Sequence, residues 1–188
     1  MSREKTRRER YENKKNTAKT YPISLVTINF KCDGNLAYLL RAAACFGAEC
    51  VHVIGVLPPR SDLNAQSGSL YDYIEIKQHK TPCEFLDYAK DKEIRLISAE
   101  LCENSKPISS YALGSHKHFA VVVGHEELGV PVEILQHSDK VYIPMPGVGF
   151  CLNTSQAANI MLYEMVNKYE YRQKQIEKWR NAECYHLT

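Results

Sequence analysis

The chain has 188 residues, of which 44% are hydrophobic and 24% are charged. This is enough for one well-buried core and too little for two ordinary domains, so we expect one domain with tails. The apolar runs are far shorter than the roughly 20 residues of a membrane span, and the first ten residues are charged where a secretory signal would be apolar. We therefore expect a cytoplasmic protein with no membrane association.

The seven cysteines are scattered along the chain without a C-x-x-C pair. An odd number of cysteines without a secretory signal is typical of reduced thiols. We therefore expect neither structural disulfides nor a metal site.

The formal net charge of +2 is unevenly distributed. Residues 1–20 carry eight basic and three acidic side chains, the stretch from Lys168 to Arg180 is also basic, and the body between them is acidic. Basic ends are typical of a protein that holds a polyanion with its termini, and a solvated tail is the alternative. We divide the chain into a basic arm (1–20), a domain (21–168), and a basic helix and tail (169–188).

Strands and helices are predicted to alternate along the body. Alternating or β-branched runs predict strands at 23–30, 50–57, 71–76, 94–99, 119–124 and 140–144. Helical spacing of apolar residues and capping signals predict helices from Leu36, Pro82, Pro131 and Asn153. Loops are expected at 33–35, 58–64 and around 106–107, and Thr154 and Ser155 are candidate caps of the last helix. This alternation predicts an α/β fold with an open, mainly parallel sheet covered on both faces.

Ligands bind at the carboxyl ends of the strands in such a sheet, so the loops there are candidate sites. After the first strand, Asn35 opens a helix that carries Arg41 about two turns later. After the strand at 119–124 comes Gly124-His-Glu-Glu-Leu-Gly129, whose glycines permit close backbone approach to a ligand. This loop has the spacing of neither a dinucleotide fold nor a P-loop.

A third segment runs from Ile143 through prolines and glycines to Asn153, where it offers free backbone N–H groups at a helix start. Taken singly, this segment is a tight turn and Arg41 is a surface arginine with its stem on apolar residues. The function therefore depends on the three segments together.

Together they resemble the SpoU branch of the SPOUT methyltransferases, over roughly residues 24–168. The resemblance rests on the Asn35 to Arg41 spacing followed by Ala-Ala-Ala-Cys-Phe-Gly47, on Gly124 to Gly129, and on Ile143-Pro-Met-Pro-Gly147 through Leu152-Asn153-Thr-Ser155-Gln-Ala-Ala. Each motif is weak alone, but three in the correct order are specific. The resemblance implies a deep trefoil knot between about residues 120 and 168, and a homodimer whose site is completed across the subunit interface.

The resemblance also implies the chemistry, which is methyl transfer from S-adenosylmethionine to a ribose 2′-hydroxyl of a structured RNA. A tRNA is favoured over an rRNA, because no separate RNA-binding domain is visible. The implied catalytic residues are Asn35, Arg41, Glu126 and Asn153. The implied S-adenosylmethionine contacts are Ala99, Gly124, Ile143, Met145, Gly147 and Leu152. Arg41 is expected to bind the target phosphate and to stabilise charge on the ribose oxygen.

Two positions depart from the family pattern. His125 stands where the family usually has asparagine, and Cys151 stands where it usually has serine. A histidine can donate or accept a hydrogen bond, so we expect it to be tolerated, whereas a thiol is a weaker partner than a hydroxyl. Cys151 thus leaves open a SPOUT-like RNA-binding protein without catalysis. A base methyltransferase of the same fold is a second alternative.

Overall fold

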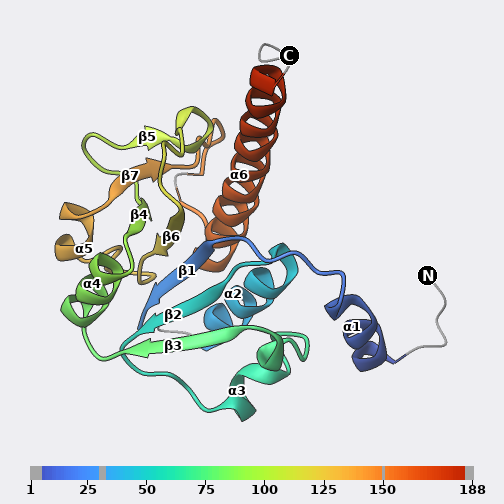
Figure 1. Ribbon diagram of the computed structural model, residues 1–188. Helices are drawn as coiled ribbons and strands as arrows, with labels where there is room; N and C mark the ends of the chain where they lie inside the picture. Colours follow the sequence, from blue (N-terminus) through green and yellow to red (C-terminus); the bar gives the residue numbers. More distant parts are fainter. Residues whose placement is uncertain (1–5, 30–32, 150, 185–188) are drawn as a thin grey trace.

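Seven parallel strands form the centre of the protein (Figure 1). The computed structural model describes residues 6–29, 33–149 and 151–184, and the seven strands are those found among these residues. The strands are β1 (Ile23–Ile28), β2 (Cys50–Ile54), β3 (Glu75–His79), β4 (Ile94–Ala99), β5 (Lys106–Pro107), β6 (His118–Val123) and β7 (Asp139–Tyr142). Their order across the sheet is β3-β2-β1-β6-β4-β7-β5, and each neighbouring pair is parallel. The predicted open parallel sheet is confirmed.

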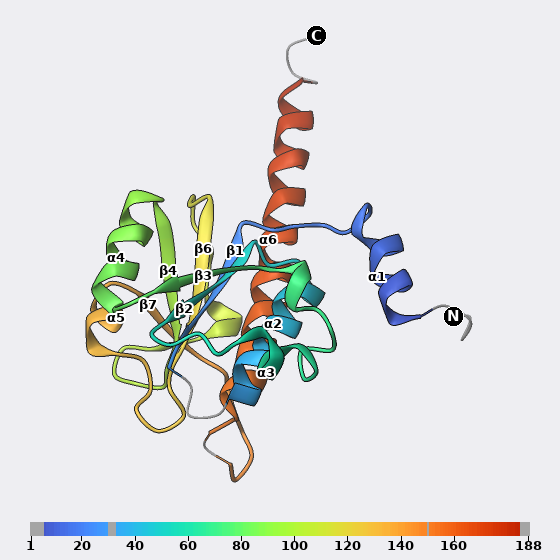
Figure 2. The same cartoon turned by 90° about the horizontal axis from the view of Figure 1, so that it is seen from below.

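Helices cover both faces of this sheet (Figures 1 and 2). The helices of the described residues are α1 (Arg7–Lys15), α2 (Asp33–Phe46), α3 (Arg60–Asn64), α4 (Pro82–Asp91), α5 (Val132–Gln136) and α6 (Thr154–Cys184), with 3-10 turns at Tyr71–Tyr73 and Ile108–Ser110. Of these, α1 lies to the side of the sheet and covers neither face. Leu39 of α2 and Met161 of α6 join the core on one face, and Phe85 of α4 and Ile134 of α5 join the core on the other. Among the described residues, no helix combines the length and the apolar character that a membrane span requires.

β1 carries apolar side chains on both of its faces. All six of its residues are buried. Ile23 and Leu25 join the core under α2 and α6, whereas Val26 and Ile28 join the core under α4 and α5. A parallel strand covered on both faces needs apolar side chains in both directions, which makes its sequence nearly continuously hydrophobic.

β7 is inserted between two strands that follow one another in the sequence. In the register of the sheet, Val141 lies between Ala99 of β4 and Lys106 of β5. Residues 100–105 therefore cross from one side of β7 to the other, and the segment that leads from β7 to α6 has to run past them. A trefoil knot forms when one segment passes through a loop made by another, so this topology favours the predicted knot, which stays a prediction.

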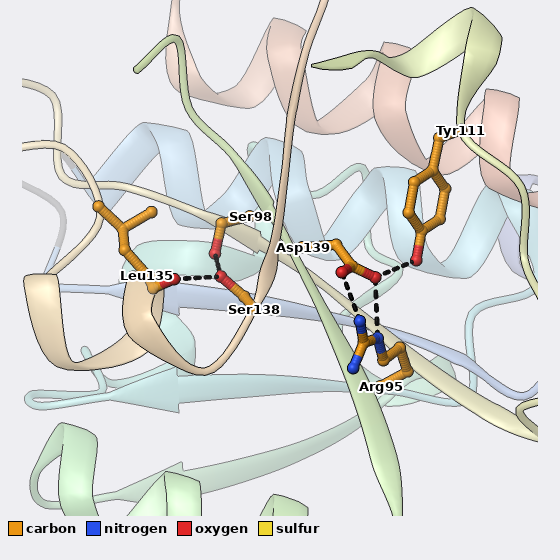
Figure 3. Close-up of polar contacts among 6 residues, drawn as sticks. All are labelled: Arg95, Ser98, Tyr111, Leu135, Ser138 and Asp139. Atoms are coloured by element: carbon orange, nitrogen blue, oxygen red, sulfur yellow. Dashed lines mark hydrogen bonds and ion pairs between the residues drawn. The ribbon is translucent and has the colours of Figure 1, made fainter. Parts of the chain in front are cut away.

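A polar cluster holds the start of β7 (Figure 3). Arg95 of β4 donates two hydrogen bonds to the Asp139 carboxylate, the one from Nε at 2.8 Å, and the Tyr111 hydroxyl donates a third at 2.6 Å. Burial opposes ionisation of this carboxyl, but the hydrogen bonds from Arg95 and Tyr111 outweigh it and lower the pKa of Asp139. The hydroxyls of Ser98 and Ser138 lie 2.6 Å apart beside the cluster. An ion pair between Arg95 and Asp139 therefore joins β7 to β4, in addition to the backbone pairing of the two strands.

Several predictions of local structure are wrong. Residues 71–73 form a 3-10 turn, and the strand expected at 71–76 lies at Glu75–His79, because these five residues pair in register with β2. Pairing with a neighbouring strand outweighs the intrinsic preference of tyrosine for strands. The expected loop at 58–64 contains α3, whose Leu63 is fully buried. The expected loop at 106–107 pairs with β7 as β5, and α2 already begins at Asp33.

The helix predicted from Pro82 is confirmed with its cap. The Thr81 hydroxyl accepts the Glu84 N–H at 3.2 Å. The Glu84 carboxylate accepts the Lys80 N–H instead of that of Thr81. The reciprocal half of the capping box is therefore displaced by one residue.

The basic arm contains α1, a helix that was not predicted. The Thr6 hydroxyl accepts the Glu9 N–H, and the Glu9 carboxylate accepts the Thr6 N–H, which is a complete capping box. The Thr-x-x-Glu spacing was the available signal. The Tyr11 hydroxyl donates to the Gly68 carbonyl at 3.0 Å, and the Tyr73 hydroxyl donates to Glu12 at 2.7 Å. The described part of the arm is therefore attached to the body.

Candidate active site

The ends of three neighbouring strands lie side by side at one edge of the sheet. Ala99 at the end of β4 is in register with Val123 of β6 and with Val141 of β7. Gly124 follows β6 directly, and Ile143 follows β7 directly. The structure thus brings together three of the residues implied for S-adenosylmethionine, namely Ala99, Gly124 and Ile143.

The loop after β6 is closed tightly on itself. The N–H groups of His125 and Gly129 each donate to the other's carbonyl at 3.0 Å. A Cβ added to Gly124 would lie 2.2 Å from the carbonyl carbon of Gly129, so a side chain does not fit there. His125 Nδ1 accepts the Glu127 N–H at 3.1 Å. The histidine that departs from the family pattern therefore supports the conformation of its own loop.

Glu100 holds this loop against the end of β4, and it was not predicted as a site residue. Its Oε2 accepts the N–H of the buried Val130 at 3.0 Å, and its own N–H donates to the Val141 carbonyl at 2.9 Å. One residue therefore joins the loops that follow β4 and β6 to β7. The available signal was a carboxylate directly after a strand, at the edge where ligands bind.

Three of the four predicted catalytic residues form one hydrogen-bonded chain. Asn35 Nδ2 donates to Glu126 Oε1 at 2.5 Å, and Asn153 Nδ2 donates to Asn35 Oδ1 at 3.0 Å. The Asn35 side chain is buried with both of its polar atoms bonded, so its orientation is determined by its partners. The chain links α2, the loop after β6 and the residue that precedes α6.

Asn153 also caps α6. Its Oδ1 accepts the backbone N–H of Ser155 at 2.9 Å and the Ser155 hydroxyl at 2.6 Å, and its carbonyl accepts the Ala157 N–H at 2.9 Å. An asparagine in this position satisfies N–H groups that the first helical turn leaves without a partner. The prediction of Thr154 and Ser155 as caps is therefore wrong by one or two residues.

Arg41 shares a cavity with this network. Its neighbours Leu39 and Leu40 are fully buried, whereas Arg41 is exposed. A cavity of about 670 Å³ is lined by Asn35, Arg41 and Asn153, among others. A Cβ added to Gly68 would lie 3.6 Å from Arg41 Cζ, so the guanidinium lies beside the turn that follows α3. The structure therefore brings Asn35 and Asn153 to the same space as Arg41, and Asn35 is bonded to Glu126.

The segment from β7 to α6 is open to solvent. Gly147, Cys151 and Leu152 are exposed, and Met145 is partly buried. A Cβ added to Gly147 would meet no atom within 4 Å. Met145, Gly147 and Leu152 thus lie on this open segment beyond the strand ends, and their contact with S-adenosylmethionine stays a prediction.

The basic C-terminal residues differ in their availability. α6 continues through residues 169–184 as one helix. Lys168 donates to the Ser109 carbonyl, and Arg172 donates to two backbone carbonyls with its guanidinium 5.0 Å from the ring centre of Tyr169. Lys174 and Lys178 are exposed. We therefore expect Lys174 and Lys178 to contact a polyanion more readily than Lys168 and Arg172, whose donors are already bonded to backbone carbonyls.

The fold and the strand-end motifs define one protein family. The profile of the SpoU rRNA Methylase family matches residues 22–163, which include β1, the hydrogen-bonded chain and the start of α6. The chain belongs to this family.

Curated relatives are similar over the same part of the chain. The tRNA (guanosine(18)-2′-O)-methyltransferase of Escherichia coli (strain K12) is 22% identical over 131 residues, which are 69% of this chain and 56% of that protein. The protein of the same name from Thermus thermophilus is 27% identical, covering 69% and 66%. The 23S rRNA (guanosine(2553)-2′-O)-methyltransferase RlmP of Bacillus subtilis is 27% identical over 137 residues, covering 70% and 53%. The chain thus spans about half to two thirds of these relatives.

Solved structures share the fold. The A. aeolicus TrmH/SpoU tRNA modifying enzyme superposes with a TM-score of 0.75 at 20% identity, covering 94% of this chain and 97% of that one. An RNA 2′-O ribose methyltransferase superposes with a TM-score of 0.71 at 26% identity, covering 81% and 59%. The predicted SPOUT fold class is confirmed.

Proposed function

We propose that this chain transfers a methyl group to a ribose 2′-hydroxyl of a structured RNA, with S-adenosylmethionine as the donor. The observation that carries the proposal is the bonded pair Asn35 and Asn153, which lines one cavity with Arg41 in a member of the SpoU family. The names of the relatives support it, since they specify 2′-O-methylation of tRNA or of 23S rRNA.

The strand ends fit S-adenosylmethionine. Gly124 lets the backbone of its loop close up against β6, and Gly147 has open space where a side chain would lie. Backbone N–H and carbonyl groups around Ala99, Gly124 and Ile143 would hold the donor, together with Met145, Gly147 and Leu152. When bound, S-adenosylmethionine supplies an activated methyl group.

The side chains of the cavity act on the RNA. A guanidinium offers a planar fork of donors that suits phosphate, so Arg41 would bind the target nucleotide and stabilise negative charge as it develops on the ribose oxygen. A guanidinium offers hydrogen-bond donors and no acceptor, so we assign Arg41 to charge stabilisation and not to proton abstraction. Asn35, held between Glu126 and Asn153, would orient the start of the helix that carries Arg41.

The RNA, the location and the oligomer follow from different observations. We favour a tRNA, because the names of the E. coli and T. thermophilus relatives specify tRNA, and a cytoplasmic location agrees with such a substrate.

We propose a homodimer through α2 and α6, on which Tyr38, Ile160 and Tyr163 are large and exposed. Tyr38 lines the cavity of Arg41, so a second copy on this face would cover the site. Light scattering should give about twice the chain mass of 21.5 kDa.

Nucleoside analysis tests the function directly. The purified protein is incubated with S-adenosylmethionine and either total tRNA or rRNA, and the digested RNA is examined by mass spectrometry. A 2′-O-methylated nucleoside is the expected product. A base-methylated nucleoside would show the base methyltransferase alternative. RNA binding without S-adenosylmethionine binding or product would show the non-catalytic alternative.

A further inference from the structure

A second cavity lies between the docked arm and the end of α2. Its volume is about 440 Å³, and its walls include Tyr11 and Lys14 of α1, Phe46 of α2 and Tyr73 of the 3-10 turn. Arg41, Cys45 and Phe46 line both this cavity and the one that contains Asn35 and Asn153. We call it the arm cavity; it continues the candidate active site past Arg41.

The aromatic walls of the arm cavity are held in place. The rings of Tyr11 and Tyr73 meet edge to face with centroids 5.5 Å apart. The Tyr11 hydroxyl is bonded to the Gly68 carbonyl and the Tyr73 hydroxyl to Glu12, so both phenols are satisfied. Tyr11, Phe46 and Tyr73 are each partly exposed. The hydroxyls of Tyr11 and Tyr73 are therefore already bonded, and these residues present the surface of their rings to the cavity.

The charged side chains that line the arm cavity are all basic. Lys14, Lys15, Lys19 and Arg41 line it, and no carboxylate is among the described residues that do. The nearby Glu170 is bonded to Lys19 at 2.9 Å and to Tyr21 at 2.5 Å. Lys14, Lys15 and Arg41 are exposed. The cavity thus combines cations with aromatic rings, the combination that binds unpaired nucleotides through phosphate and base.

We propose that the arm cavity binds a nucleotide next to the methylated one, with its base against Tyr11, Phe46 or Tyr73 and its phosphate on Lys14 and Lys15. Since Arg41 borders both cavities, a strand that places its target ribose at Arg41 continues into the arm cavity. This inference rests on the proposed function and adds a specific RNA subsite to it. It assigns the arm a local role that its net charge alone does not require.

Two variants with equal charge changes test this role. Lys14→Gln/Lys15→Gln removes two cations that line the cavity, and Arg7→Gln/Arg10→Gln removes two from the same helix that do not line it. Both are titrated with a fluorescein-labelled 12-nucleotide single-stranded RNA and with total tRNA at several salt concentrations. The lysine variant should bind the RNA at least tenfold more weakly. The slope of its log affinity against log salt concentration should be shallower by about 1 to 2, which corresponds to about 1 to 2 fewer released counterions. The arginine variant should stay within about twofold of the wild type, and equal losses in the two variants would overturn the subsite.

Photo-cross-linking places the base. The same RNA carrying 4-thiouridine is irradiated with the wild-type protein, and the adducts are mapped by mass spectrometry. Adducts on peptides that contain Tyr11, Phe46 or Tyr73 are expected, and adducts confined to residues 169–184 would overturn the proposal. Methylation is measured on the same samples. If the RNA is methylated but both variants lose the same RNA affinity, the subsite is refuted and the proposed function stands. If only the lysine variant loses RNA affinity and no RNA is methylated, the proposed function is refuted and the subsite stands.

Discussion

The side-chain amide of Asn153 donates to the side-chain oxygen Oδ1 of Asn35 at 3.0 Å, although the two residues are 118 positions apart in the chain. The oxygen of the same Asn153 amide accepts from Ser155 and starts α6. The Asn35 amide nitrogen donates in turn to Glu126. One pair of amides therefore joins the start of α2 to the start of α6 and to the loop after β6. Arg41 is carried two turns along α2, so this pair contributes to its position.

Asn153→Asp should separate the two roles of this residue. An aspartate keeps the oxygen that caps α6 and is an equally good cap, so thermal stability should change little. It loses the donor to Asn35, a hydrogen bond whose loss costs about 1 kcal/mol, so turnover should fall roughly fivefold. Asn153→Ala is the companion variant, and it should lose turnover and about 1 kcal/mol of stability through the missing cap. Normal turnover in Asn153→Asp would show that the contact with Asn35 has no catalytic importance.

Arg41→Lys should lose about 10²-fold or more in turnover while S-adenosylmethionine binding stays intact. The lysine keeps the positive charge but loses the planar fork of donors, and removal of one donor to a developing oxyanion has an effect of this size. Single-turnover methylation and calorimetry with S-adenosylmethionine are measured together, because a damaged pocket would mimic a damaged catalyst. Arg60→Lys, at an exposed ion pair with Asp72, is the matched control. Near-normal single-turnover rates for Arg41→Lys would make Arg41 a surface arginine.

The sequence allowed the strands and the site segments to be predicted because their signals are local. β1 is buried throughout and is apolar except at Ser24 and Thr27, β6 is apolar from Phe119 to Val123, and the cap at Thr81 marks the start of α4. The strand order could not be predicted, because β7 enters between β4 and β5 through pairings that involve residues far apart in the sequence. β5 has only two residues and takes its identity from β7 alone.

The candidate site was predictable to a similar extent. Asn35, Glu126 and Asn153 could be proposed from a family resemblance, but their direct bonding depends on three elements that meet only in the folded chain. Glu100 was missed, because its position directly after a strand does not by itself show that its carboxylate accepts a distant backbone N–H. The arm cavity was also missed, since it exists only where α1 docks through Tyr11.

Glu100→Ala should loosen the loop that contains Glu126. It leaves the buried N–H of Val130 without its acceptor, at a cost of about 1 to 3 kcal/mol. Amide hydrogen exchange should rise at residues 125–130, and S-adenosylmethionine affinity should fall by roughly tenfold, since Gly124 borders the same loop. Glu103→Ala, an exposed glutamate three residues further on, is the control. Unchanged exchange at residues 125–130 in Glu100→Ala would contradict the assignment.

A buried histidine pair on the other side of the molecule makes stability depend on pH. His52 Nδ1 lies 2.9 Å from His79 Nε2, and His52 Nε2 lies 3.3 Å from Cys50 Sγ, under Phe85 and Tyr88 of α4. Burial, the second imidazole and Lys77 lower the pKa of His52 to about 3. Burial and Lys77 also lower the pKa of His79, although Glu84 opposes this. His52 is therefore neutral in the native state at physiological pH, and burial favours the neutral form of His79 as well.

Acidification should consequently destabilise the protein before its carboxyl groups titrate. The unfolded chain takes up a proton at position 52 near pH 6.5 and the native chain does not, so the free energy of unfolding falls as the pH drops below that value. Between pH 7 and pH 5 the loss that comes from His52 is about 2 kcal/mol. Urea unfolding of His52→Gln at both pH values should show a pH-dependent loss smaller by about 2 kcal/mol, whereas His137→Gln, at an exposed position, should match the wild type. An equal loss in His52→Gln and the wild type would mean that His52 is protonated in the native protein.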